Sequence, residues 1–305
     1  MMLNYDIKGS VIYIETDKLQ AQIQTEGYVS GVSAGTLLDK NTGARDLGYG
    51  LSIVDFLLEE GEDKPDDPNP YHYGDLYHGN IPKRYVELPQ ICTQAKKLPY
   101  EITKANGFIA VRQWFNWTIA TRNRKPGSLW EQILVFPEDK RYFFSTDRIT
   151  SVNTVENLAL RIDMPGHLNH NHGDSFSQIY LSYYGTIPNT EFFDDFPPDA
   201  KFRYVRSRGP LPERIIRAYQ TRSGAWLAGM TLNPKNVSEA WCHQRGYVCF
   251  IEEVGREKIL EGETFSSVYI VGFFDSIDEM EKVYDQYIGA SDIVIKPSFK
   301  IILPD

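Results

Sequence analysis

Apolar and polar residues alternate with a period of two along most of this chain, which is the pattern of β-strands with one buried face. Residues 9–56 show it in the segments SVIYIETD, LQAQIQTE and LSIVDFL, with a turn predicted at Asn41–Gly43. Asn106-Gly107 separates two alternating runs and predicts a tight hairpin. We therefore expect antiparallel strands throughout.

Further strands are predicted at residues 129–137, 140–152 and 156–165, and strand-like segments resume from Arg217. Residues 276–289, SIDEMEKVYDQYIG, form the one convincing helix: Ser276 can cap it, with Glu279 at the third position and Gly289 after its end. Many strands with frequent turn signals and one late helix predict an all-β fold, a large antiparallel β-sandwich with one C-terminal helix. We expect residues 1–305 to form a single domain.

Charge and composition exclude several classes of partner. The chain carries a net charge of −9 with a pI near 5.3 and has no run rich in Lys and Arg, so we expect no binding to nucleic acid. No apolar run is long enough to cross a bilayer. The first residues, MMLNYDIKGSVIYIETD, do not resemble a signal peptide, which predicts a cytoplasmic protein, or a secreted or periplasmic one if a signal was trimmed.

The three cysteines are widely spaced and form no CxxC motif, so we expect buried, reduced thiols rather than disulfides or a zinc knuckle. The aromatic share of 13% suits both a sheet core and platforms on which sugar rings stack. The oligomeric state stays open.

The stretch ILEGETFSSVYIVGFFDSIDEMEKVYDQY, residues 259–287, resembles the C-terminal end of galactose-mutarotase-like sandwich proteins. In those proteins a Pro-Gly-Glu turn precedes a last long strand and a helix; here the turn is Glu261-Gly262-Glu263, without the proline. The resemblance implies a supersandwich of two large antiparallel sheets with a sugar site on its concave face. It implies a carbohydrate ligand and leaves the chemistry open among epimerases, lyases and binding relatives. The signature around the catalytic histidine of aldose 1-epimerases has no counterpart here, so no catalytic residue is carried over.

Three of the six histidines gather in residues 160–185, LRIDMPGHLNHNHGDSFSQIYLSYYG, between two predicted strands. Pro165-Gly166 is expected to open a loop there and Gly173-Asp174 to close it. On an extended segment two residues two apart face the same way, so His170 and His172 could act as acid and base or hold a divalent metal together with His167. Metal binding, metal-free catalysis and a purely structural role all stay open, and no cofactor is required.

Two other stretches concentrate titratable and aromatic side chains. They are YHYGDLYHGNIPKRYVELPQI, residues 71–91, and AWCHQRGYVCFIEE, residues 240–253. The residue types there suit an acidic sugar, because a guanidinium pairs well with a planar carboxylate. The predicted substrate-binding residues are Arg84, Arg245, Lys83, Tyr77, Tyr85, Trp241 and Tyr247.

The leading hypothesis is a polysaccharide lyase that cleaves a uronate-containing saccharide by β-elimination. The predicted proton-transfer residues are His170, His172, Tyr183, Tyr184, His78 and His243. The alternatives are an aldose epimerase or mutarotase, and a non-catalytic carbohydrate-binding protein. A carboxylate pair for glycoside hydrolysis is a weaker alternative, with candidates Glu131, Glu239, Glu252 and Asp174.

Overall fold

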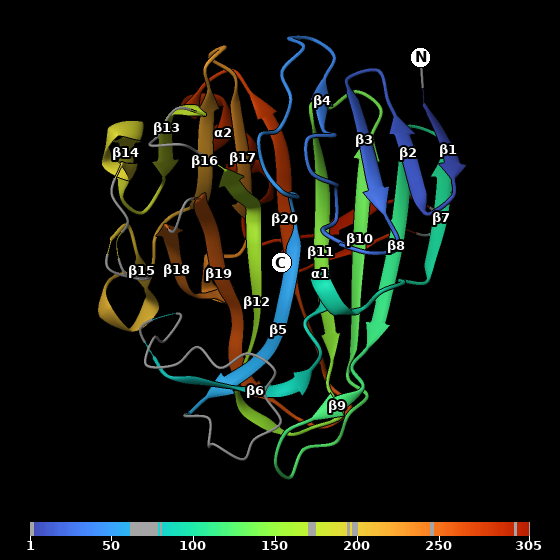
Figure 1. The fold of residues 1–305 in the computed structure, drawn as a ribbon, viewed down its shortest axis with the longest axis vertical. Helices are drawn as coiled ribbons and strands as arrows, with labels where there is room; N and C mark the ends of the chain where they lie inside the picture. Colours follow the sequence, from blue (N-terminus) through green and yellow to red (C-terminus); the bar gives the residue numbers. More distant parts are fainter. Residues whose placement is uncertain are drawn as a thin grey trace.

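The protein folds into two large antiparallel sheets that face each other across an apolar core, seen in a computed structural model (Figure 1). The structure describes residues 3–61, 79, 81–169, 175–193, 196, 201–244, 247–295 and 298–304. The side chains of Asn169, His243, Gln244, Arg256 and Glu257 lie outside this description.

The main sheet has nine strands, and each pairs antiparallel with its neighbours. In spatial order they are β14 (Gly185–Pro188), β13 (Phe176–Leu181), β16 (Ile215–Thr221), β17 (Trp226–Thr231), β20 (Thr264–Phe274), β11 (Tyr142–Thr150), β10 (Leu129–Pro137), β8 (Phe108–Asn116) and β7 (Tyr100–Ala105).

The facing sheet has seven strands, also antiparallel. In spatial order they are β15 (Tyr204–Val205), β18 (Val237–Gln244), β19 (Tyr247–Ile259), β12 (Val155–Asn169), β5 (Ile53–Glu60), β6 (Lys83–Leu88) and β9 (Ile119–Ala120).

Smaller elements complete the fold. The N-terminal sheet comprises β1 (Asn4–Lys8), β2 (Val11–Glu15), β3 (Leu19–Gln24) and β4 (Leu38–Asp39), and its apolar residues join the same core. The remaining elements are helices α1 (Ile91–Gln94) and α2 (Ile277–Tyr287), 3₁₀ turns η1 (Asn189–Phe192), η2 (Arg206–Arg208) and η3 (Pro234–Asn236), and the strand pair β21 (Asp292–Val294) and β22 (Lys300–Ile302).

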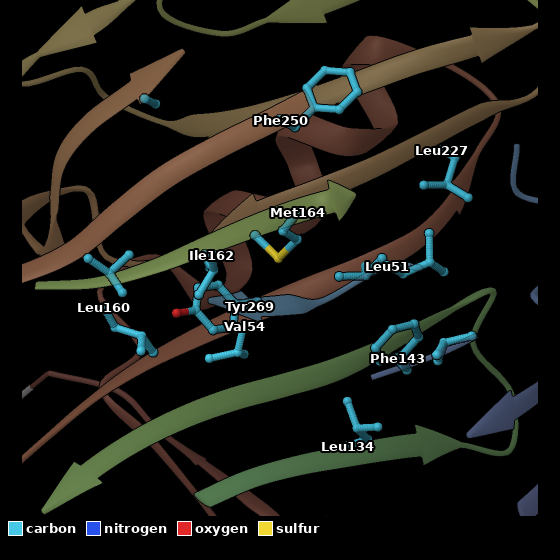
Figure 2. Close-up of a cluster of buried hydrophobic side chains, with 14 of the residues drawn as sticks. Leu51, Val54, Leu134, Phe143, Leu160, Ile162, Met164, Leu227, Phe250 and Tyr269 are labelled. Atoms are coloured by element: carbon cyan, nitrogen blue, oxygen red, sulfur yellow. The ribbon is translucent and has the colours of Figure 1, made fainter. Parts of the chain in front are cut away.

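Alternation along single strands sorts side chains between the two faces of each sheet, as the sequence pattern predicts. On β10, Leu134 lies in the core between the sheets, while Ile133 and Val135 pack on the opposite face with Met280 and Tyr284 of α2. Figure 2 shows Leu134 and Phe143 of the main sheet across the core from Leu160, Ile162 and Met164 of β12.

Several local predictions are confirmed. β7 and β8 form the hairpin across Asn106-Gly107, with Ala105 opposite Phe108. The Ser276 hydroxyl accepts a hydrogen bond from the Glu279 amide at 3.1 Å, and Gly289 follows α2 with a φ of +82°, a conformation that glycine adopts without strain. All three cysteines are free and buried. The short helix α1 was not predicted, and it has no side-chain cap that could have signalled it. Within the described residues no helix has the length and apolar character needed to cross a membrane.

The expectation that a loop opens at Pro165-Gly166 is wrong, because β12 continues through these residues to Asn169. Asp163 lies opposite Ile251 of β19, and His167 lies opposite Cys249. Between these two pairs the chain advances four residues along β12 but only two along β19. This mismatch is a β-bulge in β12. Gly166 permits it with a φ of +96°, and a Cβ there would meet the Gly50 carbonyl oxygen.

A buried carboxyl group in the core makes stability depend on pH. Asp147 is fully buried. Its Oδ1 atom accepts hydrogen bonds from the Trp130 indole N–H at 2.8 Å and from the side-chain amide of Gln132 at 3.2 Å. Burial raises the pKa of Asp147 to about 7. Because the folded state then holds this proton more tightly than the unfolded chain, the contribution of Asp147 to stability is fully present below its ordinary pKa of 3.8 and is lost as pH rises through about 7.

We expect Asp147→Asn to remove part of this dependence, since the amide keeps an acceptor for Trp130 and Gln132 and cannot ionise. Urea unfolding at about pH 5 and about pH 8 checks this, and the midpoint of the wild type should fall more between the two than that of the variant. Equal falls in both proteins would show that Asp147 does not carry the effect.

Candidate functional site

The facing sheet turns several charged side chains away from the core. On β12, Leu160, Ile162 and Met164 point into the core (Figure 2), so Arg161 and Asp163 between them point to the opposite face. Their pairing partners on β19, Glu253 and Ile251, lie on that same face. The sequence of β12 thus puts charge on one side of the sheet and apolar contact on the other.

A cavity of ≈ 290 Å³ lies over this face. Strand β5 contributes Asp55 to its lining, and β12 contributes Arg161, Asp163 and His167. Strand β19 contributes Tyr247 and Cys249. Tyr28 and the start of α1 line it as well. The full lining is Tyr28, Asp55, Gln90, Cys92, Thr93, Arg161, Asp163, His167, Tyr247, Cys249 and Ile251.

The bulge in β12 brings Asp163 and His167 together. On a regular strand, residues four apart would be roughly 13 Å from each other. Here the His167 Nε2 atom is 3.7 Å from the Asp163 Oδ2 atom. The Tyr49 amide donates to the His167 carbonyl at 3.1 Å and holds this end of the strand in place. The extra residues of the bulge therefore place Asp163 and His167 next to each other, whereas a regular strand would keep them apart.

Cys249 completes a cluster with this pair. One ligand-type atom from each of Asp163, His167 and Cys249 lies within 4.8 Å of the other two. Asp163 and Cys249 are each 2% exposed. The Asp163 Oδ1 and His167 Nδ1 atoms are buried and have no hydrogen-bond partner among the described residues.

The acidic groups of the cavity have pKa values near neutrality. Burial raises the pKa of Asp163 to about 7, and nearby Arg217 and Arg161 oppose the rise. Burial, and then the charge of Asp163, raises the pKa of Asp55 to about 6. Asp55 accepts hydrogen bonds from the Gln90 amide at 2.7 Å and from the Cys92 thiol at 3.4 Å. Burial lowers the pKa of His167, so its imidazole is mostly neutral at pH 7.

Beside the cavity, buried cations are matched by carboxylates. The Arg161 Nη2 atom lies 2.7 Å from Glu253, and the Lys83 Nζ atom lies 3.0 Å from Glu253 and 3.4 Å from Glu239. Both cations also lie against the Trp241 ring, each 5.6 Å from its centroid. The positive charges of Arg161 and Lys83 are thus balanced by the carboxylates of Glu253 and Glu239.

The predicted substrate-binding residues occupy different environments. Lys83 belongs to the network just described, and the Arg84 Nε atom pairs with Glu59 at 2.8 Å. Tyr85 is 2% exposed and packs edge-on against Phe56, and Trp241 is fully buried, so both rings belong to the packed sheet and lack an exposed face for a sugar. Tyr247 is 39% exposed, lines the cavity, and has its ring 5.5 Å from that of His167.

Tyr183 and Tyr184 lie in other cavities. They follow β13, which belongs to the main sheet, whereas β12 belongs to the facing sheet. Tyr183 lines a cavity of ≈ 530 Å³ and stands 5.8 Å from Tyr204, ring to ring. Tyr184 is 60% exposed and packs against Phe202. The structure does not bring either tyrosine into the cavity of His167.

Several predicted residues fall outside the described part of the chain. They are His170, His172, Asp174, Tyr77, His78, Arg245 and the side chain of His243. The backbone register does place His243 of β18 opposite Cys249 of β19. The roles predicted for these residues stay predictions, as does a metal held by His167 with His170 and His172.

The carboxylates considered for glycoside hydrolysis do not form a shared site. Glu131 lies on β10 of the main sheet, where it pairs with Arg112. Glu239 contacts Lys83, and Glu252 faces the core, where it contacts Arg217 at 3.2 Å. Sequence reasoning missed Asp55 and Asp163 instead. Their signal was a single carboxylate with apolar residues directly on both sides, in VDF and IDM.

The network around Lys83 gives a stability prediction. We expect Lys83→Met to lower the free energy of unfolding by about 3–5 kcal/mol, because it removes a positive charge from between two carboxylates held out of water. The matched control is Lys125→Met, whose exposed ion pair with Glu261 at 3.0 Å should contribute almost nothing. Urea denaturation measures both, and equal effects would contradict a special role for the buried network.

Comparison with known proteins identifies the fold. No family model and no curated protein sequence matches this chain. A solved galactose mutarotase-like protein from Clostridium acetobutylicum superposes with a TM-score of 0.51 and 10% identity, over 90% of this chain and 99% of its own. An α-mannosidase from Enterococcus faecalis V583 gives a TM-score of 0.50 and 11% identity, over 94% of this chain and 32% of its own. At these identities the likeness concerns the fold alone: the chain is an all-β sandwich of the galactose-mutarotase-like type, as the sequence predicted.

Proposed function

We propose that this chain is a carbohydrate-active enzyme and that a sugar binds in the cavity of Asp55, Asp163 and His167. At ≈ 290 Å³ the cavity is near the small end of small-molecule pockets, about 300–1,000 Å³, which suits a single sugar unit. Tyr28 and Tyr247 line it and are 40% and 39% exposed, and aromatic rings are groups on which sugars stack. The name of the galactose mutarotase-like protein that shares the fold supports a sugar ligand.

Of the reactions that the sequence left open, we propose 1-epimerisation of a neutral aldose. A base takes the proton of the anomeric hydroxyl while an acid protonates the ring oxygen, and the bond between C1 and that oxygen breaks. The open-chain aldehyde then closes on its other face with the proton transfers reversed. The reaction needs an acid and a base close together with pKa values near the working pH, and no cofactor.

The single observation that carries this proposal is the pair of Asp163 and His167. Their Oδ2 and Nε2 atoms are 3.7 Å apart in the cavity. The raised pKa of Asp163, about 7, and the lowered pKa of His167 mean that near neutral pH one holds a proton and the other can accept one. We assign His167 as the base and Asp163 as the acid.

β-Elimination on a uronate, the leading hypothesis from the sequence, has less support. That reaction needs a positive group to offset the substrate carboxylate. Among the described lining residues the cation is Arg161, which already pairs with Glu253 at 2.7 Å, while Asp55 and Asp163 add acidic groups. Such a lining favours a neutral sugar.

Polarimetry on freshly dissolved α-D-glucose and α-D-galactose tests the assignment. We expect His167→Ala and Asp163→Asn each to lower kcat/KM for anomer interconversion by roughly 10²–10⁴-fold, the usual contribution of a general acid or base. Asp147→Asn, which changes a buried aspartate on another sheet, is the control and should keep full activity. Unaltered rates in both cavity variants would refute the roles. An unsaturated, ultraviolet-absorbing product from a uronate polysaccharide would favour the lyase, and binding without turnover would favour a binding protein.

The pKa directions also predict a bell-shaped pH profile. Activity should fall as pH rises through about 7, because Asp163 then loses the proton it must donate. It should also fall on the acid side, below the ordinary His value of 6.5, as His167 becomes protonated. A kcat/KM profile measured by polarimetry checks this, and a rate that keeps rising into alkaline pH would contradict the assignment.

A further inference from the structure

The cluster of Asp163, His167 and Cys249 contains three different types of metal-binding group. Their donor atoms lie within 4.8 Å of one another, and Asp163 and His167 approach to 3.7 Å. Tetrahedral zinc, with bonds of about 2.0–2.3 Å, holds its ligand atoms roughly 3.3–3.8 Å apart. Closing the cluster around an ion therefore needs side-chain shifts of about 1 Å or less.

We propose that Asp163, His167 and Cys249 bind a zinc ion. The Asp163 carboxylate, whose Oδ2 atom approaches the His167 Nε2 atom, has its other oxygen, Oδ1, buried without a hydrogen-bond partner among the described residues. Leaving such groups unpaired out of water is costly, and a bound cation removes that cost. Cys249 is free to act as a ligand because it forms no disulfide.

The donor set favours zinc over magnesium or calcium. Thiolate and imidazole are ligands of zinc and similar transition metals, whereas magnesium and calcium are bound by oxygen. Three protein ligands at the wall of a cavity leave a fourth position open to a water or a sugar hydroxyl, as in zinc sites that are not purely structural. The bulge in β12 builds this site, because it places His167 beside Asp163 and opposite Cys249.

This inference does not rest on the proposed function. Zinc would occupy the same imidazole and carboxylate that proton transfer at a sugar requires. The acid–base activity therefore belongs to the metal-free chain, and zinc should inhibit it. A chain that binds zinc and has no epimerase activity would leave the metal site standing and remove only the proposed function.

The test uses the full chain, stripped of metal with a chelator and titrated with Zn²⁺ by calorimetry and with Co²⁺ by absorption spectroscopy. We expect one zinc per chain and a thiolate-to-cobalt charge-transfer band. Cys249→Ala should abolish the band and weaken zinc binding by at least about 100-fold, since even loss of an outer partner of a ligand costs roughly 10–100-fold.

The matched control is Cys92→Ala, which changes another buried thiol of the same cavity that lies outside the cluster. It should keep both the zinc affinity and the cobalt band. Absence of saturable zinc binding, absence of the band in the wild type, or unchanged affinity in Cys249→Ala would each overturn the proposal. The band in the wild type tests thiolate ligation even if the variant fails to fold.

Discussion

The bulge in β12 is the feature on which the rest of the candidate site depends. Strand pairing normally keeps residues four apart well separated, and here the pairing with β19 absorbs extra residues between Asp163 and His167. The glycine at 166 permits the required backbone, close against the Gly50 carbonyl. A carboxyl group and an imidazole thereby face each other over a cavity, next to a thiol from the neighbouring strand.

The charges around the cavity explain why we favour a neutral ligand. Arg161 lines it and Lys83 lies beside it, and each contacts a buried glutamate and the Trp241 ring. The cavity itself keeps Asp55 and Asp163, whose raised pKa values leave them partly protonated near neutral pH. Groups that gain or lose a proton near neutral pH suit acid–base chemistry on the hydroxyl groups of a sugar. The proposed zinc ion would bind the same Asp163 carboxylate and His167 imidazole.

The sequence predicted the architecture well because the relevant signals are local. Period-two alternation, the Asn106-Gly107 turn and the Ser276 cap each act over a few residues, and the structure contains all three features. The site was harder to predict because it depends on register between strands distant in the chain. Pro165-Gly166 looks like the start of a loop, and only the pairing with β19 shows that the strand continues.

Proximity in sequence was also a poor guide to proximity in space. Tyr183 is only 16 residues after His167 in the sequence. The two side chains nevertheless line different cavities, because β12 and β13 belong to different sheets. Asp55 and Cys249, by contrast, come from opposite ends of the chain and line the same one. Trp241 and Tyr85 are aromatic residues that suit sugar stacking by type, but burial within the sheet decides their role.

We propose that this protein binds its ligand in the cavity built by the β12 bulge. The most direct measurement is a crystal structure of the chain with a bound monosaccharide. We expect the sugar to lie over the facing sheet, against Asp55, Asp163 and His167, with a ring face near Tyr247. A sugar bound instead in the larger cavity of Tyr180, Tyr183 and Tyr204 would contradict it.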